Sequence, residues 1–148
     1  MIKIIENFKT PMPIFLEDCI TSCIELQDKT LRFTFEDKDL SYENKQLSIK
    51  NLEVSFLLPE NFLDESFVPP VRILKFNKRY NRSIVKYWLL KDFIEFILKK
   101  RYELKFYETY YNENKALLIF ELMKSDISQD RLECTIELSV ERIVYTWD

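Results

Sequence analysis

The chain of 148 residues contains no glycine and no histidine. An average protein has about 7% glycine, so roughly ten glycines would be expected at this length. Phosphate-binding loops, dinucleotide fingerprints, nucleophile elbows and EF-hand loops need glycine, because their backbone takes positive φ or lies against a ligand. Without histidine there is no Ser–His or Cys–His pair and no imidazole metal ligand. The side chain that most often acts as a general base near neutral pH is also missing. These absences exclude most common classes of catalytic site.

Cysteine is scarce, with only Cys19, Cys23 and Cys134. On a strand, a spacing of four residues would place the first two about 13 Å apart, whereas a disulfide needs Cα atoms within about 7 Å. We therefore expect unbridged thiols in a reducing compartment, packed as small hydrophobic side chains. A thiolate metal site would have only carboxylates to complete it, so no metal and no other cofactor is expected.

Long hydrophobic runs are missing as well. The most apolar stretch, Tyr87–Leu98, is interrupted by three charged residues and is too short to cross a bilayer. The first ten residues show no apolar core or cleavage site of a secretory signal. We expect one globular domain over residues 1–148, located in the cytoplasm and without membrane association.

Alternation of apolar and polar residues is the dominant pattern, and it is typical of antiparallel strands with one buried face. Leu31, Phe33 and Phe35 alternate cleanly, and residues 27–30 form a turn back to the preceding apolar run. Further strands are expected over residues 71–76, 84–88, 102–111 and 117–123. Residues 47–58 are expected to form one long strand, irregular near Asn51. Residues 132–147 are expected to form another, with a slip of phase near Glu141.

One segment changes period. Between residues 89 and 101 apolar residues recur at spacings of three and four, with charged residues opposite and basic residues at the carboxyl end. This pattern predicts an amphipathic helix whose last turn complements the helix dipole. The sequence therefore predicts an α+β fold: a mainly antiparallel sheet of about seven or eight strands with one helix.

Charge is distributed unevenly along the chain. Residues 71–105 hold 11 Lys or Arg against 3 Asp or Glu, whereas the remaining residues hold 11 against 22. Basic residues among aromatic ones can bind single-stranded nucleic acid, and the candidates are Lys75, Lys78, Arg79, Tyr80, Arg82 and Lys86. The competing interpretation places several bases on the solvated face of the helix and the aromatic residues in the core. The acidic chain as a whole, with a pI of about 5.2, argues against a dedicated nucleic-acid binder.

No catalytic residue is assigned. Glu17 and Asp18 interrupt an apolar run, but adjacent strand residues point to opposite faces, and Asp18 can instead satisfy backbone groups at a turn. An enzyme with a carboxylate or lysine base stays open as an alternative. For a protein-interaction surface, the candidates are Glu17, Asp18, Tyr107, Tyr110, Tyr111 and Trp147, because Tyr and Trp give contact area at low entropic cost. Alternation along strands would place about half of these aromatic residues in the core.

The two ends of the chain carry a resemblance. The segment from Ile14 to Leu26, with its hairpin return, resembles the start of a group of small bacterial proteins, and the ending with Tyr145 and Trp147 is similar to their Tyr-x-Trp strand. Many of these proteins are domains of unknown function, and some resemble immunity proteins of polymorphic toxin systems, which bind and neutralise a cognate toxin. Asp18 matches the group, whereas Glu17 stands where the group has histidine.

These observations together predict a non-catalytic protein-binding module, and the resemblance implies an immunity-type inhibitor whose partner is a cognate bacterial toxin. Acidic residues outside 71–105 would steer association with a cationic toxin. Single-stranded nucleic-acid binding through residues 71–105 and an uncharacterised enzymatic activity are the alternatives.

Overall fold

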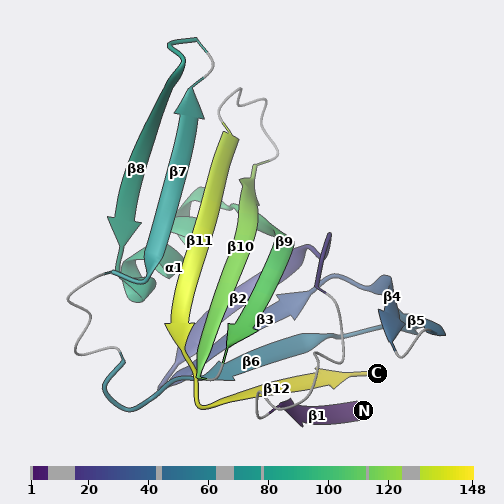
Figure 1. Ribbon diagram of the computed structural model, residues 1–148. Helices are drawn as coiled ribbons and strands as arrows, with labels where there is room; N and C mark the ends of the chain where they lie inside the picture. The colour runs from purple at the N-terminus through teal and green to yellow at the C-terminus, as the bar shows by residue number, and fades with distance from the viewer. Residues whose placement is uncertain are drawn as a thin grey trace.

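The computed structural model describes residues 2–6, 16–42, 45–62, 69–77, 79–112, 114–124 and 131–148. Their strands form two five-stranded antiparallel sheets and a separate hairpin (Figure 1). Sheet A has the order β1 (Ile2–Glu6), β12 (Arg142–Trp147), β6 (Glu53–Leu57), β3 (Thr30–Phe35) and β2 (Thr21–Gln27). Sheet B has the order β8 (Arg82–Trp88), β7 (Val71–Asn77), β11 (Arg131–Ser139), β10 (Lys115–Met123) and β9 (Glu103–Asn112). The hairpin is β4 (Lys38–Tyr42) with β5 (Lys45–Ile49), and helix α1 (Leu90–Lys100) connects β8 to β9.

The predicted α+β fold, built mainly from antiparallel sheet, is confirmed. The expected turn at residues 27–30 joins β2 to β3, the four further expected strands correspond to β7, β8, β9 and β10, and the expected helix corresponds to α1. The described residues hold twelve strands rather than seven or eight, because β1 and β4 were not expected and both long strands are divided.

Both predicted long strands leave one ladder and enter another partway. Residues 47–58 contain part of β5, which pairs with β4, and then β6 of sheet A. Asn51 between them has a φ of 52°, which ends the extended backbone. Residues 132–147 pass from β11 in sheet B to β12 in sheet A. At this crossing the Val140 N–H donates to the Asn114 carbonyl at 2.7 Å and the Glu141 N–H to the Leu57 carbonyl at 2.8 Å. The irregularities in the sequence therefore mark changes of ladder rather than bulges.

The inner faces of the two sheets share one core. Phe106 of β9 is fully buried, and its ring centroid lies 5.3 Å from that of Phe33 in sheet A and 5.3 Å from that of Phe120 in sheet B. The perpendicular arrangement of Phe106 and Phe33 is a favoured aromatic geometry. Phe93 of α1 packs against Phe120 with centroids 6.2 Å apart. The alternation read from the sequence therefore points large side chains from both sheets and the helix into the same interior.

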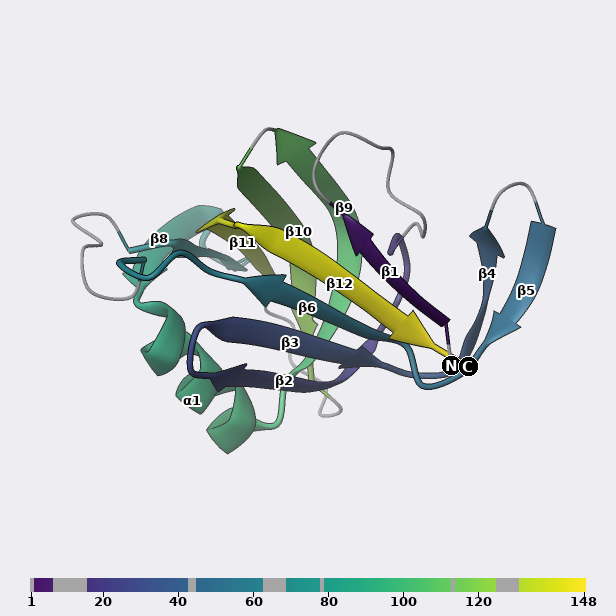
Figure 2. The ribbon, with the colours of Figure 1, turned by 90° about the horizontal axis from the view of Figure 1, so that it is seen from below.

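Helix α1 covers one end of this core, beside β2 (Figure 2). Leu90, Phe93, Ile94 and Ile97 are buried, and the charged side chains lie on the opposite face. Lys99 and Lys100 occupy the last turn, where cations interact favourably with the helix dipole. Arg101 follows in the left-handed conformation, with φ 57° and ψ 44°.

The chain makes its left-handed backbone positions without glycine. Five described residues have φ between 48° and 61°: Asp18, Asp28, Asn51, Asn81 and Arg101. Four of them are Asp or Asn, the non-glycine residues that tolerate this region best, because their short polar side chains can hydrogen-bond locally. The absence of glycine therefore leaves the turns intact, and Arg101 is the position with the largest expected strain.

The two sheets are joined along β2 and β9. The Thr21 hydroxyl accepts a hydrogen bond from the Leu104 N–H at 3.1 Å, and the Cys19 carbonyl accepts one from the Phe106 N–H at 2.9 Å. Ile20 forms an isolated antiparallel bridge with Lys105. Sheet B therefore carries a covered edge at β9 and places β8 at its other edge.

Candidate binding surface

The β7–β8 hairpin stands at the margin of the molecule. Its register runs from Val71 opposite Trp88 to Asn77 opposite Arg82, and β7 joins it to sheet B through β11. Every residue of β8 from Arg82 to Tyr87 is exposed. In Figure 1 the tip of this hairpin extends beyond the neighbouring strands. A strand with both faces accessible to solvent is unusual in a sheet that buries a core.

Apolar side chains are concentrated on this exposed strand. Ile84 is 53% exposed, Val85 46% and Tyr87 59%. Five of the seven large hydrophobic side chains that are exposed in the described part of the chain lie between Tyr80 and Leu89. Singly scattered exposed apolar residues need no explanation, but here they gather on both faces of one strand, with Ile84 on one face and Val85 and Tyr87 on the other, which is typical of an interaction site. We call Ile84, Val85 and Tyr87 the β8 cluster.

The charged residues of the same hairpin are all basic. Residues 71–88 contain six Lys or Arg and no Asp or Glu. Arg82 and Lys86 lie within β8 and are exposed, and the guanidinium of Arg79 lies 5.5 Å from the centre of the Tyr80 ring. The charged residues that share the hairpin with the β8 cluster are therefore all basic.

This arrangement brings together five of the six candidate nucleic-acid contacts: Lys75, Arg79, Tyr80, Arg82 and Lys86. Lys78 lies outside the described residues. The prediction that the aromatic residues of this stretch lie in the core is wrong for Tyr80 and Tyr87, which are 62% and 59% exposed. Alternation is uninformative for β8 because neither face of this strand is covered between Arg82 and Tyr87, whereas Val71 and Ile73 of β7 are buried.

An open groove of about 950 Å³ adjoins the hairpin on the outer face of sheet B. Arg72 and Tyr87 line it from the hairpin, Leu117 and Ile119 line it from β10, and Phe62 lies in the segment that leads toward β7. The shared residue Tyr87 makes the groove continuous with the β8 cluster.

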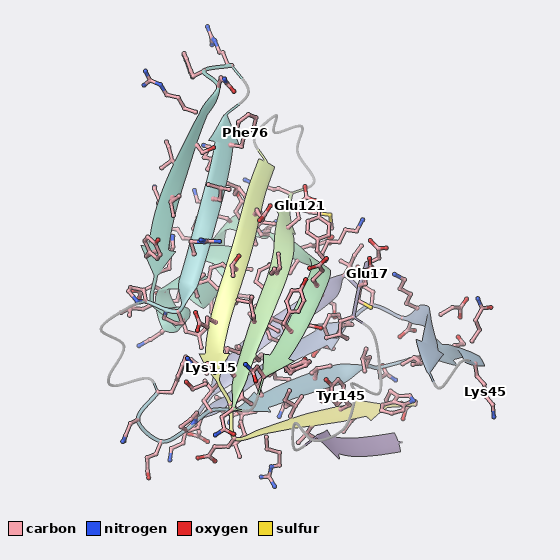
Figure 3. The ribbon with its side chains drawn as sticks, in the orientation of Figure 1. Glu17, Lys45, Phe76, Lys115, Glu121 and Tyr145 are labelled. Atoms are coloured by element: carbon pink, nitrogen blue, oxygen red, sulfur yellow. The ribbon has the colours of Figure 1, made fainter. Side chains whose placement is uncertain are left out.

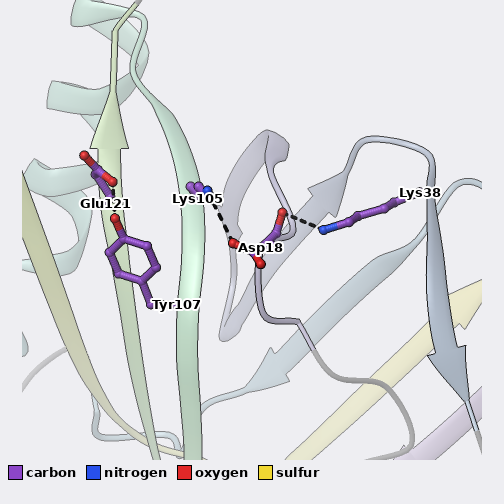
Figure 4. A network of polar contacts seen from close by, with 5 residues as sticks. All are labelled: Asp18, Lys38, Lys105, Tyr107 and Glu121. Carbon is purple, nitrogen blue, oxygen red and sulfur yellow. Dashed lines mark hydrogen bonds and ion pairs between the residues drawn. The ribbon is translucent and has the colours of Figure 1, made fainter.

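Asp18 contributes contacts that hold the protein's own structure together. Its N–H donates to the Phe106 carbonyl at 2.8 Å, and its carboxylate lies 3.3 Å from the Lys105 Nζ (Figure 4). Lys38 Nζ donates to the Asp18 carbonyl oxygen at 2.9 Å. These contacts hold the turn before β2 against β9, so they explain Asp18 without a partner protein. The neighbouring Glu17 is exposed.

The predicted aromatic anchors divide between surface and core. Tyr107 donates its hydroxyl hydrogen to Glu121 on the outer face of sheet B (Figure 4), and Tyr110 is exposed and bonded to Glu108. This bond to Glu108 raises the pKa of the Tyr110 hydroxyl. Of the four aromatic candidates, Tyr107 and Tyr110 therefore lie on the outer face of sheet B.

Tyr111 and Trp147 lie on the core-facing sides of sheet B and sheet A. The Tyr111 hydroxyl lies 3.4 Å from that of Tyr145, and the Tyr111 ring stacks on Phe56. Trp147 is only 2% exposed. As a surface anchor Trp147 is a wrong assignment, because it is in phase with Ile143 and Tyr145 on the buried face of β12.

None of the three cysteines forms a disulfide, as expected. Burial raises the pKa of the Cys19 thiol to about 11, with smaller effects from Lys38, which lowers it, and Asp18, which raises it. Burial also raises the pKa of Cys134 well above its usual value. Among the described residues, no group of three or more Cys, Asp or Glu is arranged to hold a metal ion.

The β8 cluster was not predicted from the sequence. The sequence feature that could have indicated this cluster is the pair Ile84–Val85, which has basic residues on both sides in a stretch without acidic residues. Comparisons with protein-family models, with curated proteins and with solved structures gave no match. In the part of the chain that the structure describes, no helix is long and apolar enough to cross a membrane.

Proposed function

We propose that the protein is a non-catalytic protein-binding module, and more specifically an immunity-type inhibitor that binds and neutralises a cognate toxin. The observation that supports binding is the exposed β8 cluster at the edge of sheet B. Exposed apolar side chains that gather on one strand, rather than being scattered singly, are typical of an interaction site. The specific form as an inhibitor rests on the resemblance of the chain ends to immunity proteins.

The charge of the contact surface follows from the hairpin. Because the β8 cluster lies among basic side chains, the complementary surface of the toxin is expected to be acidic at this point. This differs from the cationic toxin surface that the acidic share of the chain predicts. The acidic residues outside 71–105 would then contribute to the long-range field rather than to the contact itself.

Colony survival tests the inhibitor proposal. The gene next to this one is induced in a test bacterium, with and without coexpression of this chain, and an empty plasmid serves as control. The proposal predicts that the neighbouring product kills and that this chain restores survival. If the neighbouring product kills regardless of this chain, or is harmless, the proposal is contradicted for this pair.

A second candidate function is binding of single-stranded nucleic acid. It is favoured by the gathering of basic residues with Tyr80 and Tyr87 on one exposed hairpin. Binding to oligo(dT) would weaken steeply with salt, with a slope in log affinity of about −0.7 per phosphate contacted. Absence of binding at low salt would remove this candidate.

A further inference from the structure

We infer that β8 receives an extended acidic segment of the partner protein as an additional strand of sheet B. The inference rests on the proposed function and names the chemistry of its partner. Among the described residues, β8 pairs only with β7. The opposite edge of β8 therefore presents a row of backbone N–H and C=O groups.

The backbone of β8 is suited to accept another strand. Its seven residues span about 24 Å, and its register with β7 runs without a bulge from end to end. The strand contains no proline. Proline, bulges and charged side chains are the common protections of an edge, and here only the charges of Arg82 and Lys86 are present. Strand addition would obtain affinity from main-chain hydrogen bonds and specificity from alternate side chains.

The two faces of β8 specify the incoming sequence. Arg82, Ile84 and Lys86 lie on the face that continues the core side of sheet B, because they oppose residues in phase with its buried positions. Val85 and Tyr87 lie on the outer face, where Tyr87 lines the groove. A segment that alternates carboxylate and apolar side chains would place its carboxylates beside the two cations. Its apolar residues would then lie beside the outer half of the β8 cluster.

A second copy of this chain is a poor occupant of the same edge. Pairing of β8 with β8 would bring together two hairpins that each carry six basic residues and no acidic one. Like charges across adjacent strands are destabilising. Nucleic acid would use the basic residues, but it would leave the aliphatic side chains of Ile84 and Val85 and the backbone edge unused. The observations therefore favour an acidic polypeptide strand.

The test is an NMR titration of the ¹⁵N-labelled full chain with three seven-residue peptides. The first alternates Glu and Val, the second alternates Lys and Val, and the third alternates Glu and Pro, which has the charge of the first but lacks alternate N–H donors. We expect shifts at the amides of residues 82–88 with the Glu–Val peptide, about tenfold weaker binding of the other two, and weakening by salt.

A charge-reversed variant makes the test specific. R82E/K86E is expected to reverse the preference, so that the Lys–Val peptide binds more tightly than the Glu–Val peptide. K45E/K50E carries the same change in net charge at two exposed positions, Lys45 at the start of β5 (Figure 3) and Lys50 directly after β5, and β5 lies away from the hairpin (Figure 1). This variant should keep the preference of the natural chain. Because all four lysine and arginine side chains are exposed, both variants are expected to fold.

Several results would overturn the inference. They are absence of shifts at 82–88, equal binding of the Glu–Val and Glu–Pro peptides, and concentration-dependent shifts at 82–88 without peptide, which would indicate self-association. Saturation of the same amides by oligo(dT) but not by the Glu–Val peptide would assign the hairpin to nucleic acid. If R82E/K86E still rescues colonies, β8 is not the interface although the inhibitor proposal stands. If the natural chain does not rescue but the Glu–Val peptide binds, the inhibitor proposal fails and the β8 site remains.

Discussion

At one position of this glycine-free chain, glycine should give a more stable protein than alanine. Arg101 ends α1 in the left-handed conformation, with φ 57°, and the Tyr102 N–H returns to the Ile97 carbonyl at 3.1 Å. This is the location at which helices prefer glycine. The comparison that isolates the backbone is R101G against R101A, because both variants lose the arginine side chain and its charge.

The expected difference follows from two opposing terms. A residue with a Cβ costs about 1–2 kcal/mol in the left-handed region, whereas the greater freedom of glycine in the unfolded chain costs about 0.4–1 kcal/mol. R101G should therefore be more stable than R101A by about 0.5–1 kcal/mol. At Glu95, which is exposed in the middle of α1, the same pair should show the opposite sign, with E95A more stable than E95G by about 1 kcal/mol.

Urea unfolding of the four variants measures both differences. The slope of unfolding free energy against urea should stay constant, so that the shift in midpoint reports stability alone. The reasoning is refuted if R101G is no more stable than R101A, or if the glycine–alanine difference has the same sign at both positions.

Three further predictions concern the core and the junction of the sheets. F106A should lose about 3–5 kcal/mol in urea unfolding, because Phe106 packs between both sheets; a loss under about 1 kcal/mol would mean that the sheets do not share this core. D18N keeps a residue that tolerates positive φ and loses only the ion pair with half-exposed Lys105, so it should cost less than about 1 kcal/mol, and 1 M NaCl should reduce the difference. Folding raises the pKa of Cys19 from 9.0 to about 11, so its contribution to stability is complete below pH 9 and is lost as pH rises toward 11, where the unfolded thiol ionises first. Unfolding at several pH values, compared with C19A, would contradict this if the difference did not change over that interval.

Local features of the fold were predictable from sequence because they depend on neighbours in the chain. The hairpin of β2 and β3 and helix α1 follow from periods of two and 3.6 residues. The sequence could not predict that residues 47–58 and residues 132–147 are each divided between two ladders. Both halves of each segment show the same alternation of apolar and polar residues. Only the partner strands show that β5 pairs with β4 while β6 joins β3 and β12.

The candidate binding surface was partly predictable for a similar reason. The basic composition of residues 71–88 is visible in the sequence, whereas the exposure of Ile84 and Val85 depends on how far the hairpin reaches beyond the core. Trp147 illustrates the reverse case, because its phase with Tyr145 indicates burial and overrides the general preference of tryptophan for interfaces.

The most direct test of the account is hydrogen exchange of the chain alone and in the presence of the neighbouring gene's product. The account predicts a complex in which the amides of residues 82–88 become protected, because an added strand would accept hydrogen bonds from the exposed edge of β8. Absence of a complex, or protection elsewhere with residues 82–88 unchanged, would contradict it.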